Sequence, residues 1–250
     1  MASVKRFWLV VPFILSLACN SGSPALAGKL TDAVKARDIA QVRSLIAAGE
    51  DVNEKVQRDY PINVAAAFGP AEMVAVLLEA GADIEQPGRD GLHPLHNAVF
   101  VGHRDIVALL IQKGAMVDAK GKLGRTPLVT FAATGGNDIE IPRMLLAAGA
   151  SPDIESAKAD DSPTALQYAA ETGNIELAEM LIAAHADVNH RNVRGWSPLH
   201  QALENVHPEI VRLLIAHGAD VNLENKLGKT PLDYAPNDAM RQLLIDAGAK

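Results

Sequence analysis

The sequence is poor in aromatic residues, cysteine and long apolar runs, and it has fewer basic than acidic side chains. Aromatic residues make up 4% of the 250 residues, which is few for a single deep core. One cysteine excludes both an intramolecular disulfide and a cluster of thiolate zinc ligands. A net charge of −7 disfavours nucleic-acid binding through a phosphate-neutralising surface. Since 48% of the residues are hydrophobic, we still expect a folded protein stabilised by packing.

Residues 1–27 have the features of an export signal. Lys5 and Arg6 precede an apolar run over residues 7–18, which is too short to span a bilayer. Small residues follow, and Ala25-Leu26-Ala27 is a pattern that signal peptidases accept. We therefore expect a signal peptide over 1–27 that is cleaved after Ala27.

A second interpretation of the same segment stays open. Leu17-Ala18-Cys19 is similar to a bacterial lipobox, in which the cysteine is acylated and becomes the first mature residue, although Ser16 departs from the usual leucine. A lipid on Cys19 would anchor the protein to a membrane, and this is the only membrane contact that we expect. Both interpretations predict an exported protein in the periplasm, either soluble or lipid-anchored.

A period of about 33 residues organises the rest of the chain. A proline-leucine step, or a close variant of it, begins at residues 61, 94, 127, 165, 198 and 231. The successive steps are therefore 33, 33, 38, 33 and 33 residues apart. A fixed period of this length indicates a stack of repeated units.

Each unit has the signals of two short helices and a finger-like hairpin. Thr126, Thr164, Ser197 and Thr230 stand where an N-cap begins the first helix, and proline suits the first helical position. A glycine such as Gly102 then allows a tight turn, and apolar residues at helical spacing predict the second helix. A further glycine in the left-handed conformation would end that helix.

These residues carry a family resemblance. Thr-Pro-Leu-His-x-Ala, followed by Gly-x-x-Glu-Ile-Val-x-Leu-Leu-Ile-x-x-Gly-Ala-Asp-Val-Asn, resembles the ankyrin repeat over essentially all of residues 29–250. The resemblance implies an all-α solenoid of about seven helix-turn-helix units with finger-like β-turns, curved into a stack with a concave face. We draw capping repeats at 29–55 and 225–250, and internal repeats at 56–87, 88–120, 121–157, 158–191 and 192–224.

Eight histidines raise the question of a metal or catalytic site. The resemblance gives His96 and His200 a structural role, as hydrogen-bonding groups that tie fingers to neighbouring repeats. His185 replaces a glycine where a positive φ is expected. His93 and His96 have no third ligand in the pattern, and no hydrolase, metalloprotease or phosphate-binding motif is present. We expect neither an enzyme nor a bound metal or cofactor.

The resemblance implies that the finger tips and the last residues of each first helix contact a partner. The partner-binding residues predicted in this way are Phe68, Arg89, Asp90, Leu92, Phe100, Val101, Leu123, Arg125, Asp161, Arg194, Trp196 and Leu227. Large aromatics at exposed positions often anchor interfaces, which favours Phe68, Phe100 and Trp196. In the alternative interpretation, Phe68 and Phe100 cover the ends of adjacent helices and Trp196 alone is free.

Two insertions interrupt the period near the middle of the chain. The turn between Gly135 and Met144 gains two residues, and the finger between Ala150 and Pro163 gains three. Insertions in solenoids often lie on one face, but surface loops also lengthen at little entropic cost. We expect the insertion in the turn to be tolerated sequence drift without a function. For the insertion in the finger, a role in binding and tolerated drift both stay open.

The sequence predicts an exported, bacterial-type binding protein that is monomeric on its own and holds a protein partner through its concave face. In one hypothesis it is an adaptor or stabiliser in the bacterial envelope. In the alternative it is an inhibitor or immunity-type protein that neutralises a toxic enzyme in the periplasm, such as a secreted hydrolase or phospholipase. An aromatic-centred groove would favour the inhibitor.

Overall fold

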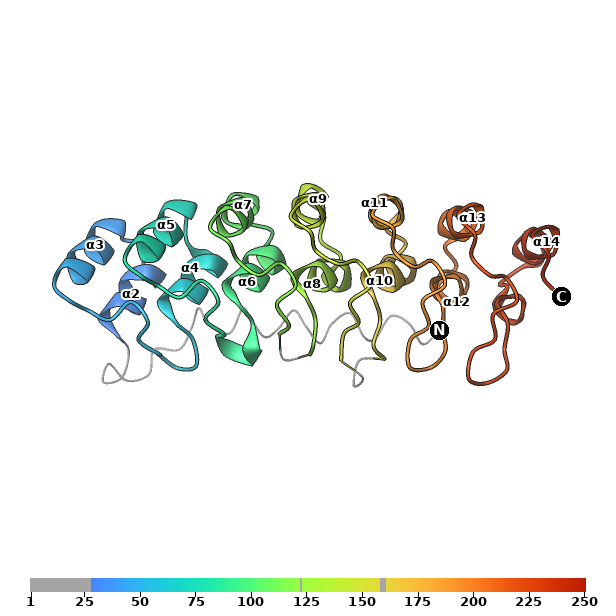
Figure 1. Ribbon diagram of the computed structural model, residues 1–250, viewed down its shortest axis with the longest axis horizontal. Helices are drawn as coiled ribbons and strands as arrows, with labels where there is room; N and C mark the ends of the chain where they lie inside the picture. The colour runs from blue at the N-terminus through green and yellow to red at the C-terminus, as the bar shows by residue number, and fades with distance from the viewer. Residues whose placement is uncertain (1–27, 122, 158–160) are drawn as a thin grey trace.

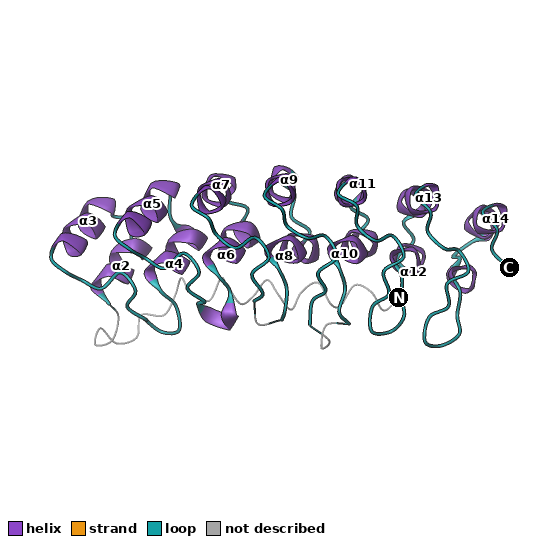
Figure 2. Cartoon of the chain, in the orientation of Figure 1, coloured by secondary structure: helices purple, strands orange, loops and turns teal. Residues whose placement is uncertain are grey.

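The computed structural model describes residues 28–121, 123–157 and 161–250, which form one elongated stack of helix pairs (Figure 1). The first helices of the pairs form one layer, and the second helices lie beside them in an outer layer (Figure 2). The first-layer elements are α2 (Lys29–Lys35), α4 (Pro61–Phe68), α6 (Pro94–Val101), α8 (Pro127–Thr134), α10 (Ala165–Thr172), α12 (Pro198–Glu204) and the 3-10 turn η4 (Pro231–Tyr234). The outer layer holds α3 (Ile39–Ala47), α5 (Ala71–Glu79), α7 (Arg104–Gln112), α9 (Glu140–Ala147), α11 (Ile175–Ala183), α13 (Pro208–Ala216) and α14 (Asp238–Asp246).

The helix ends are built by the residues that the sequence marks. The hydroxyls of Thr126, Thr164 and Ser197 each accept a hydrogen bond from the backbone N–H three residues later, so these three predicted N-caps are confirmed. Gly102 closes α6 in the left-handed conformation. His185 also has a positive φ, of 64°, as predicted.

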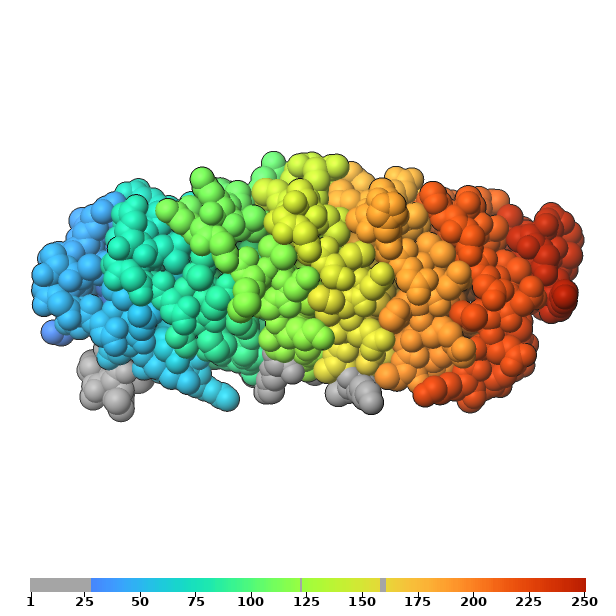
Figure 3. Space-filling model, viewed as in Figure 1, coloured from blue at the N-terminus to red at the C-terminus, as the bar shows by residue number. Residues whose placement is uncertain are grey.

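Neighbouring pairs pack through small and aliphatic side chains. Leu128, Leu166 and Leu199, at equivalent places in three successive first helices, are fully buried, and alanines fill the narrow spaces between them. Each such leucine contributes roughly 2–3 kcal/mol when its side chain leaves water. The space-filling view shows successive segments in contact along the whole stack (Figure 3). The low aromatic content therefore has a structural cause, because each layer is thin.

The described residues contain no β-strand, only one isolated antiparallel bridge between Val56 and Asp59. The predicted all-α solenoid is confirmed. None of the described helices has the length and apolar character needed to cross a membrane. The predicted signal peptide over 1–27, and with it Cys19, lies outside the described residues. The repeat boundaries drawn from the sequence stay a prediction.

Candidate functional site

Six hairpins connect each outer helix to the next first helix and project to the same side of the stack (Figure 1). We call them fingers 1 to 6, and together the finger row; they comprise residues 56–59, 88–92, 121–125, 156–163, 192–196 and 225–229. In fingers 2, 3, 5 and 6, the first residue donates its N–H to the carbonyl oxygen four residues later, at 2.9–3.0 Å. In finger 4, the same bond runs from Ser156 N to Pro163 O over seven residues, at 3.2 Å. The three-residue insertion therefore lies inside this hairpin.

Most fingers are tied to the first helix that precedes them by one buried polar side chain. Nε2 of His96 lies 2.9 Å from the carbonyl oxygen of Arg125 in finger 3, and Nε2 of His200 lies 3.2 Å from that of Lys229 in finger 6. The structural role predicted for these two histidines is confirmed. Asn63 and Gln167 hold fingers 2 and 5 in the same way. Their side-chain amides donate to Leu92 O at 3.1 Å and to Trp196 O at 2.7 Å.

The two histidine tethers act as neutral imidazoles. Nδ1 of His96 accepts from the N–H of His93 at 3.3 Å, so Nε2 carries the proton that it donates to the finger. Burial lowers the pKa of His96 from 6.5 to about 4, and burial also lowers the pKa of His200. Among the described residues, no group of three His, Cys, Asp or Glu side chains could hold a metal ion.

Finger 4 lacks this tether. Its preceding first helix, α8, carries Val129 where α4, α6, α10 and α12 carry Asn63, His96, Gln167 and His200. A valine side chain has no hydrogen-bond donor. Pro163 O, the equivalent of Trp196 O, receives only the hairpin's own bond from Ser156 among the described residues. Finger 1 is also untethered, because the hydroxyl of Thr31, at the equivalent place on α2, has no hydrogen-bond partner within the described part of the chain. The finger with the insertion is therefore one of two described fingers that the preceding first helix does not hold by a side-chain hydrogen bond.

A second set of contacts joins the chain segments that leave successive outer helices. Asn189 donates to Gly218 O at 3.1 Å and accepts from the N–H of Asp220 at 2.8 Å. Asn53 and Asn222 make the same two bonds near the ends of the stack. In the middle, the equivalent contacts come from the carboxylates of Glu85, Asp118 and Asp153, which only accept. Burial raises the pKa of the Asp118 carboxyl.

The opposite edge of the stack carries the turns between first and second helices. Nε2 of His103 and of His207 each lies 3.1 Å from a carbonyl oxygen of the first helix in the repeat before, namely Ala67 O on α4 and Glu171 O on α10. At the inserted turn, Arg104 instead forms a bidentate ion pair with Asp138, at 2.7 and 2.9 Å. This pair raises the pKa of Arg104 and lowers the pKa of Asp138.

A pocket of about 320 Å³ lies at the inserted turn, between the ends of α6 and α8. Phe100 and Val101 line one side, and Phe131 and Gly136 line the other. A side chain at Gly136 would meet the Phe131 ring at 2.4 Å, so glycine is required there. The prediction that this insertion is only tolerated sequence drift did not foresee that the inserted residues form a wall of a pocket. The adjacent Gly135-Gly136 pair was the feature of the sequence that could have indicated it.

The structure divides the predicted partner-binding residues into two groups. Phe68, Phe100 and Val101 lie at the turn ends of α4 and α6, about 12 Å of helix away from the fingers. The finger row holds the others, which are Arg89, Asp90, Leu92, Leu123, Arg125, Asp161, Arg194, Trp196 and Leu227. Leu227 is 78% exposed and Leu123, at the equivalent place in finger 3, is 48% exposed. Partner contact by these residues stays a prediction.

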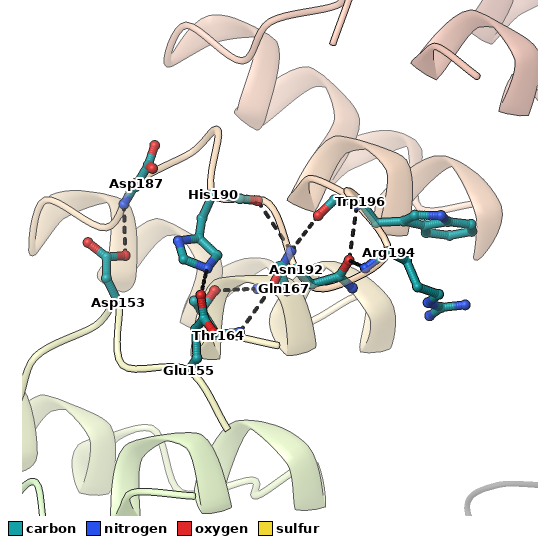
Figure 4. Close-up of polar contacts among 9 residues, drawn as sticks. All are labelled: Asp153, Glu155, Thr164, Gln167, Asp187, His190, Asn192, Arg194 and Trp196. Atoms are coloured by element: carbon teal, nitrogen blue, oxygen red, sulfur yellow. Dashed lines mark hydrogen bonds and ion pairs between the residues drawn. The ribbon is translucent and has the colours of Figure 1, made fainter. Parts of the chain in front are cut away.

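The prediction that Trp196 is an exposed aromatic anchor is wrong. Only 9% of Trp196 is exposed, because its ring packs edge-on against Tyr234, with centroids 5.0 Å apart. The Arg194 guanidinium lies over the same ring at 4.8 Å and reaches Asp161 in finger 4 at 2.8 Å. Figure 4 shows Arg194 and Trp196 extending side by side, beyond the Gln167 tether. The alternative in which Trp196 alone is free is also wrong, although Phe68 is half-buried against the core.

Sequence reasoning missed the aromatic partner of Arg125. Its guanidinium donates to the Tyr168 hydroxyl at 2.8 Å and stacks over the ring at 5.3 Å. Finger 3 leads into α8, and Arg125 therefore joins this finger to α10, the first helix of the next repeat. The two residues are 43 positions apart, which exceeds one repeat, so the period alone did not pair them.

Comparisons with known proteins agree with this architecture. A family model described as ankyrin repeats in three copies matches residues 30–121 and 116–192, and one described as ankyrin repeats in many copies matches 185–235. The crystal structure of the ankyrin repeat domain of Bcl-3, described as a unique member of the IkappaB protein family, superposes with a TM-score of 0.77 at 25% identity. That similarity covers 87% of this chain and 97% of the Bcl-3 domain.

A curated relative matches over a short stretch. The E3 ubiquitin-protein ligase KEG of Arabidopsis thaliana is 42% identical over 64 residues, which are 26% of this chain. The matched stretch is 4% of the ligase.

Proposed function

Because the chain belongs to the ankyrin-repeat family, we propose that it is a non-catalytic binding protein that holds a protein partner against its finger row. The observation that carries the proposal is the exposure of Leu123 and Leu227 on equivalent fingers. Leu227 has the highest exposed fraction among the large hydrophobic side chains of the described residues. An apolar side chain at a projecting tip stabilises nothing within the chain, and it can anchor a partner by leaving water.

The proposal includes export to the bacterial envelope, on the pattern of residues 1–27. A purified mature protein that begins at Gly28 would support cleavage after Ala27. A mature protein that begins at an acylated Cys19 would support a lipid anchor instead. Intact-mass measurement of the protein from its host distinguishes these two results, and a chain that retains Met1 in the cytosol would contradict export.

Within this proposal we favour an adaptor or stabiliser over an inhibitor. An inhibitor that caps an active site was expected to present an aromatic-centred groove. The burial of Trp196 against Tyr234 removes the main aromatic of that groove. A small apolar contact such as Leu227 suits attachment to a partner's surface.

Affinity capture from the host tests the proposal. The bait is the mature protein, and the test variant carries Leu123→Ser and Leu227→Ser. The matched control is Ile245→Ser in α14, where the side chain is 45% exposed on the outer layer. We expect a protein that the wild type and the control retain and the double variant loses. Equal retention by all three, or substrate turnover by the purified protein with no partner, would contradict the proposed function.

A further inference from the structure

The finger row differs in charge from the rest of the molecule. Among its described residues are six basic and three acidic side chains. The seven outer helices carry five basic and nine acidic side chains, and the whole chain carries 23 basic and 30 acidic side chains. A protein that is acidic overall therefore presents a basic edge.

Of the three acidic side chains among the described residues of the finger row, two are already neutralised within the row. Asp161 in finger 4 lies 2.8 Å from Arg194 in finger 5, and Asp59 in finger 1 lies 3.8 Å from Arg89 in finger 2. Arg58 and Lys226, at opposite ends of the row, are exposed and have no ion-pair partner among the described residues. Their charge is available to a bound molecule.

The exposed leucines lie in the same row as these two cations. Leu227 directly follows Lys226 in finger 6, and Leu123 lies in finger 3, between Arg58 in finger 1 and Lys226. An edge that combines basic and exposed apolar side chains complements a segment that combines acidic and apolar ones. Since neighbouring helices pack about 10 Å apart, six fingers span roughly 50 Å, the length of about 15 residues of extended chain.

We propose that the finger row binds an extended, acidic segment of a partner protein whose leucine-like side chains contact Leu123 and Leu227. This inference rests on the proposed function and specifies the chemistry of the partner. A nucleic acid is the less favoured ligand, because its phosphates would pair with the cations but would gain nothing from the exposed side chains of Leu123 and Leu227.

The probe is a fluorescein-labelled peptide of four Glu-Ser-Glu-Leu units, measured by fluorescence anisotropy at low ionic strength. The test variant is Arg58→Glu with Lys226→Glu, which reverses two charges in the finger row. The matched control is Arg212→Glu with Arg241→Glu, which reverses two exposed charges on α13 and α14. Both variants have the same net charge, so they separate local from overall electrostatics.

We expect the peptide to bind the wild type and the control alike, and the test variant at least about fivefold more weakly. Added salt should weaken binding, and replacing the peptide's leucines by serine should weaken it further. Equal loss in both variants, equal binding of a Lys-Ser-Lys-Leu peptide, or tighter binding of a single-stranded DNA of matched charge would overturn the inference. If the partner captured in the host is held by the test variant as tightly as by the wild type, the charge inference fails while the proposed function stands.

Discussion

The first helices α8 and α10 share one fold and differ in how they hold the finger that follows them. On α10, Gln167 accepts from the Thr164 N–H and donates to two carbonyl oxygens of the finger 5 region, at 2.7 and 3.2 Å. On α8, Val129 makes no such bond, and finger 4 is three residues longer. The comparison teaches that packing of the helices suffices to build the stack, whereas the shared five-residue finger shape accompanies a tethering side chain, as in fingers 2, 3, 5 and 6.

The contacts between the chain segments that leave successive outer helices show a similar contrast between the ends of the stack and its middle. Asn53, Asn189 and Asn222 each supply a donor and an acceptor, whereas Asp118 and Asp153 supply only acceptors. The middle of the stack therefore has fewer hydrogen bonds of this kind between repeats. Both insertions occur in this region, where the chain is less constrained.

Substituting Gln167→Val would give α10 the arrangement of α8, and it should have the largest effect. It leaves the N–H of Thr164 and the carbonyl oxygens of His190 and Trp196 without their partner. At roughly 1–3 kcal/mol for each buried group, we expect a loss of about 4 kcal/mol in the free energy of unfolding. Urea denaturation measures it, and the control Val129→Ala should cost less, about 1–2 kcal/mol. Equal losses would show that the tether is unimportant.

Acidification should destabilise α6, because a proton on Nδ1 of the buried His96 ends the hydrogen bond that it accepts from the His93 N–H. The folded protein binds a proton at His96 only near pH 4, whereas the unfolded chain binds one near pH 6.5. The stability from neutral His96 is therefore fully present above pH 6.5 and is lost as pH falls to 4, by about 3 kcal/mol. Chemical denaturation at a series of pH values measures this slope. His96→Gln keeps an amide donor, as Gln167 does, and should flatten the profile; an unchanged slope would assign the acid sensitivity to other groups.

Val129→Gln should install the missing tether on α8. Its amide could donate to Pro163 O and accept from Thr126 N–H, as Gln167 does for Trp196 O and Thr164 N–H. We expect about 1 kcal/mol of added stability and slower hydrogen exchange at the Ser156 amide. A destabilised protein with unchanged exchange at Ser156 would show that the long finger 4 does not approach α8.

Asp118→Asn should produce the smallest change, about 1 kcal/mol of added stability at pH 7. The amide can donate to Gly149 O, as Asn189 donates to Gly218 O, and it removes a carboxylate whose pKa is raised by burial. A raised carboxyl pKa destabilises the fold at neutral pH, and this penalty fades as pH falls through the folded pKa. The gain from Asp118→Asn should therefore shrink in acid. The reverse change, Asn189→Asp, should destabilise by a similar amount in thermal unfolding.

Much of this fold could be predicted from the sequence, because the period and the caps are local. The Thr126 and Ser197 caps, the positive φ of His185 and the tethering role of His200 all follow from residues at a fixed place in the repeat. The burial of Trp196 could not be predicted in this way. It depends on Tyr234 in the last unit, where the repeat is shortened and the pattern departs from its neighbours.

The same limit applies to the candidate site. The resemblance to ankyrin repeats implied positions on the fingers and at the ends of the first helices, and nine of the twelve predicted residues do lie in the finger row. It could not predict which of them are engaged within the chain. Arg125 is bound to Tyr168 and Arg194 to Asp161, and both contacts come from neighbouring repeats. Exposure, which decides availability to a partner, is set by those neighbours.

Photo-crosslinking in the host tests the central claim most directly, namely that the finger row binds a protein and the outer helices do not. A benzophenone side chain is placed at Leu227 in one strain and at Ile245 in another, since both positions are exposed and lie in the last unit. The account predicts a discrete crosslinked protein from position 227 and none from position 245. A crosslink from position 245 alone, or none from either position, would contradict it.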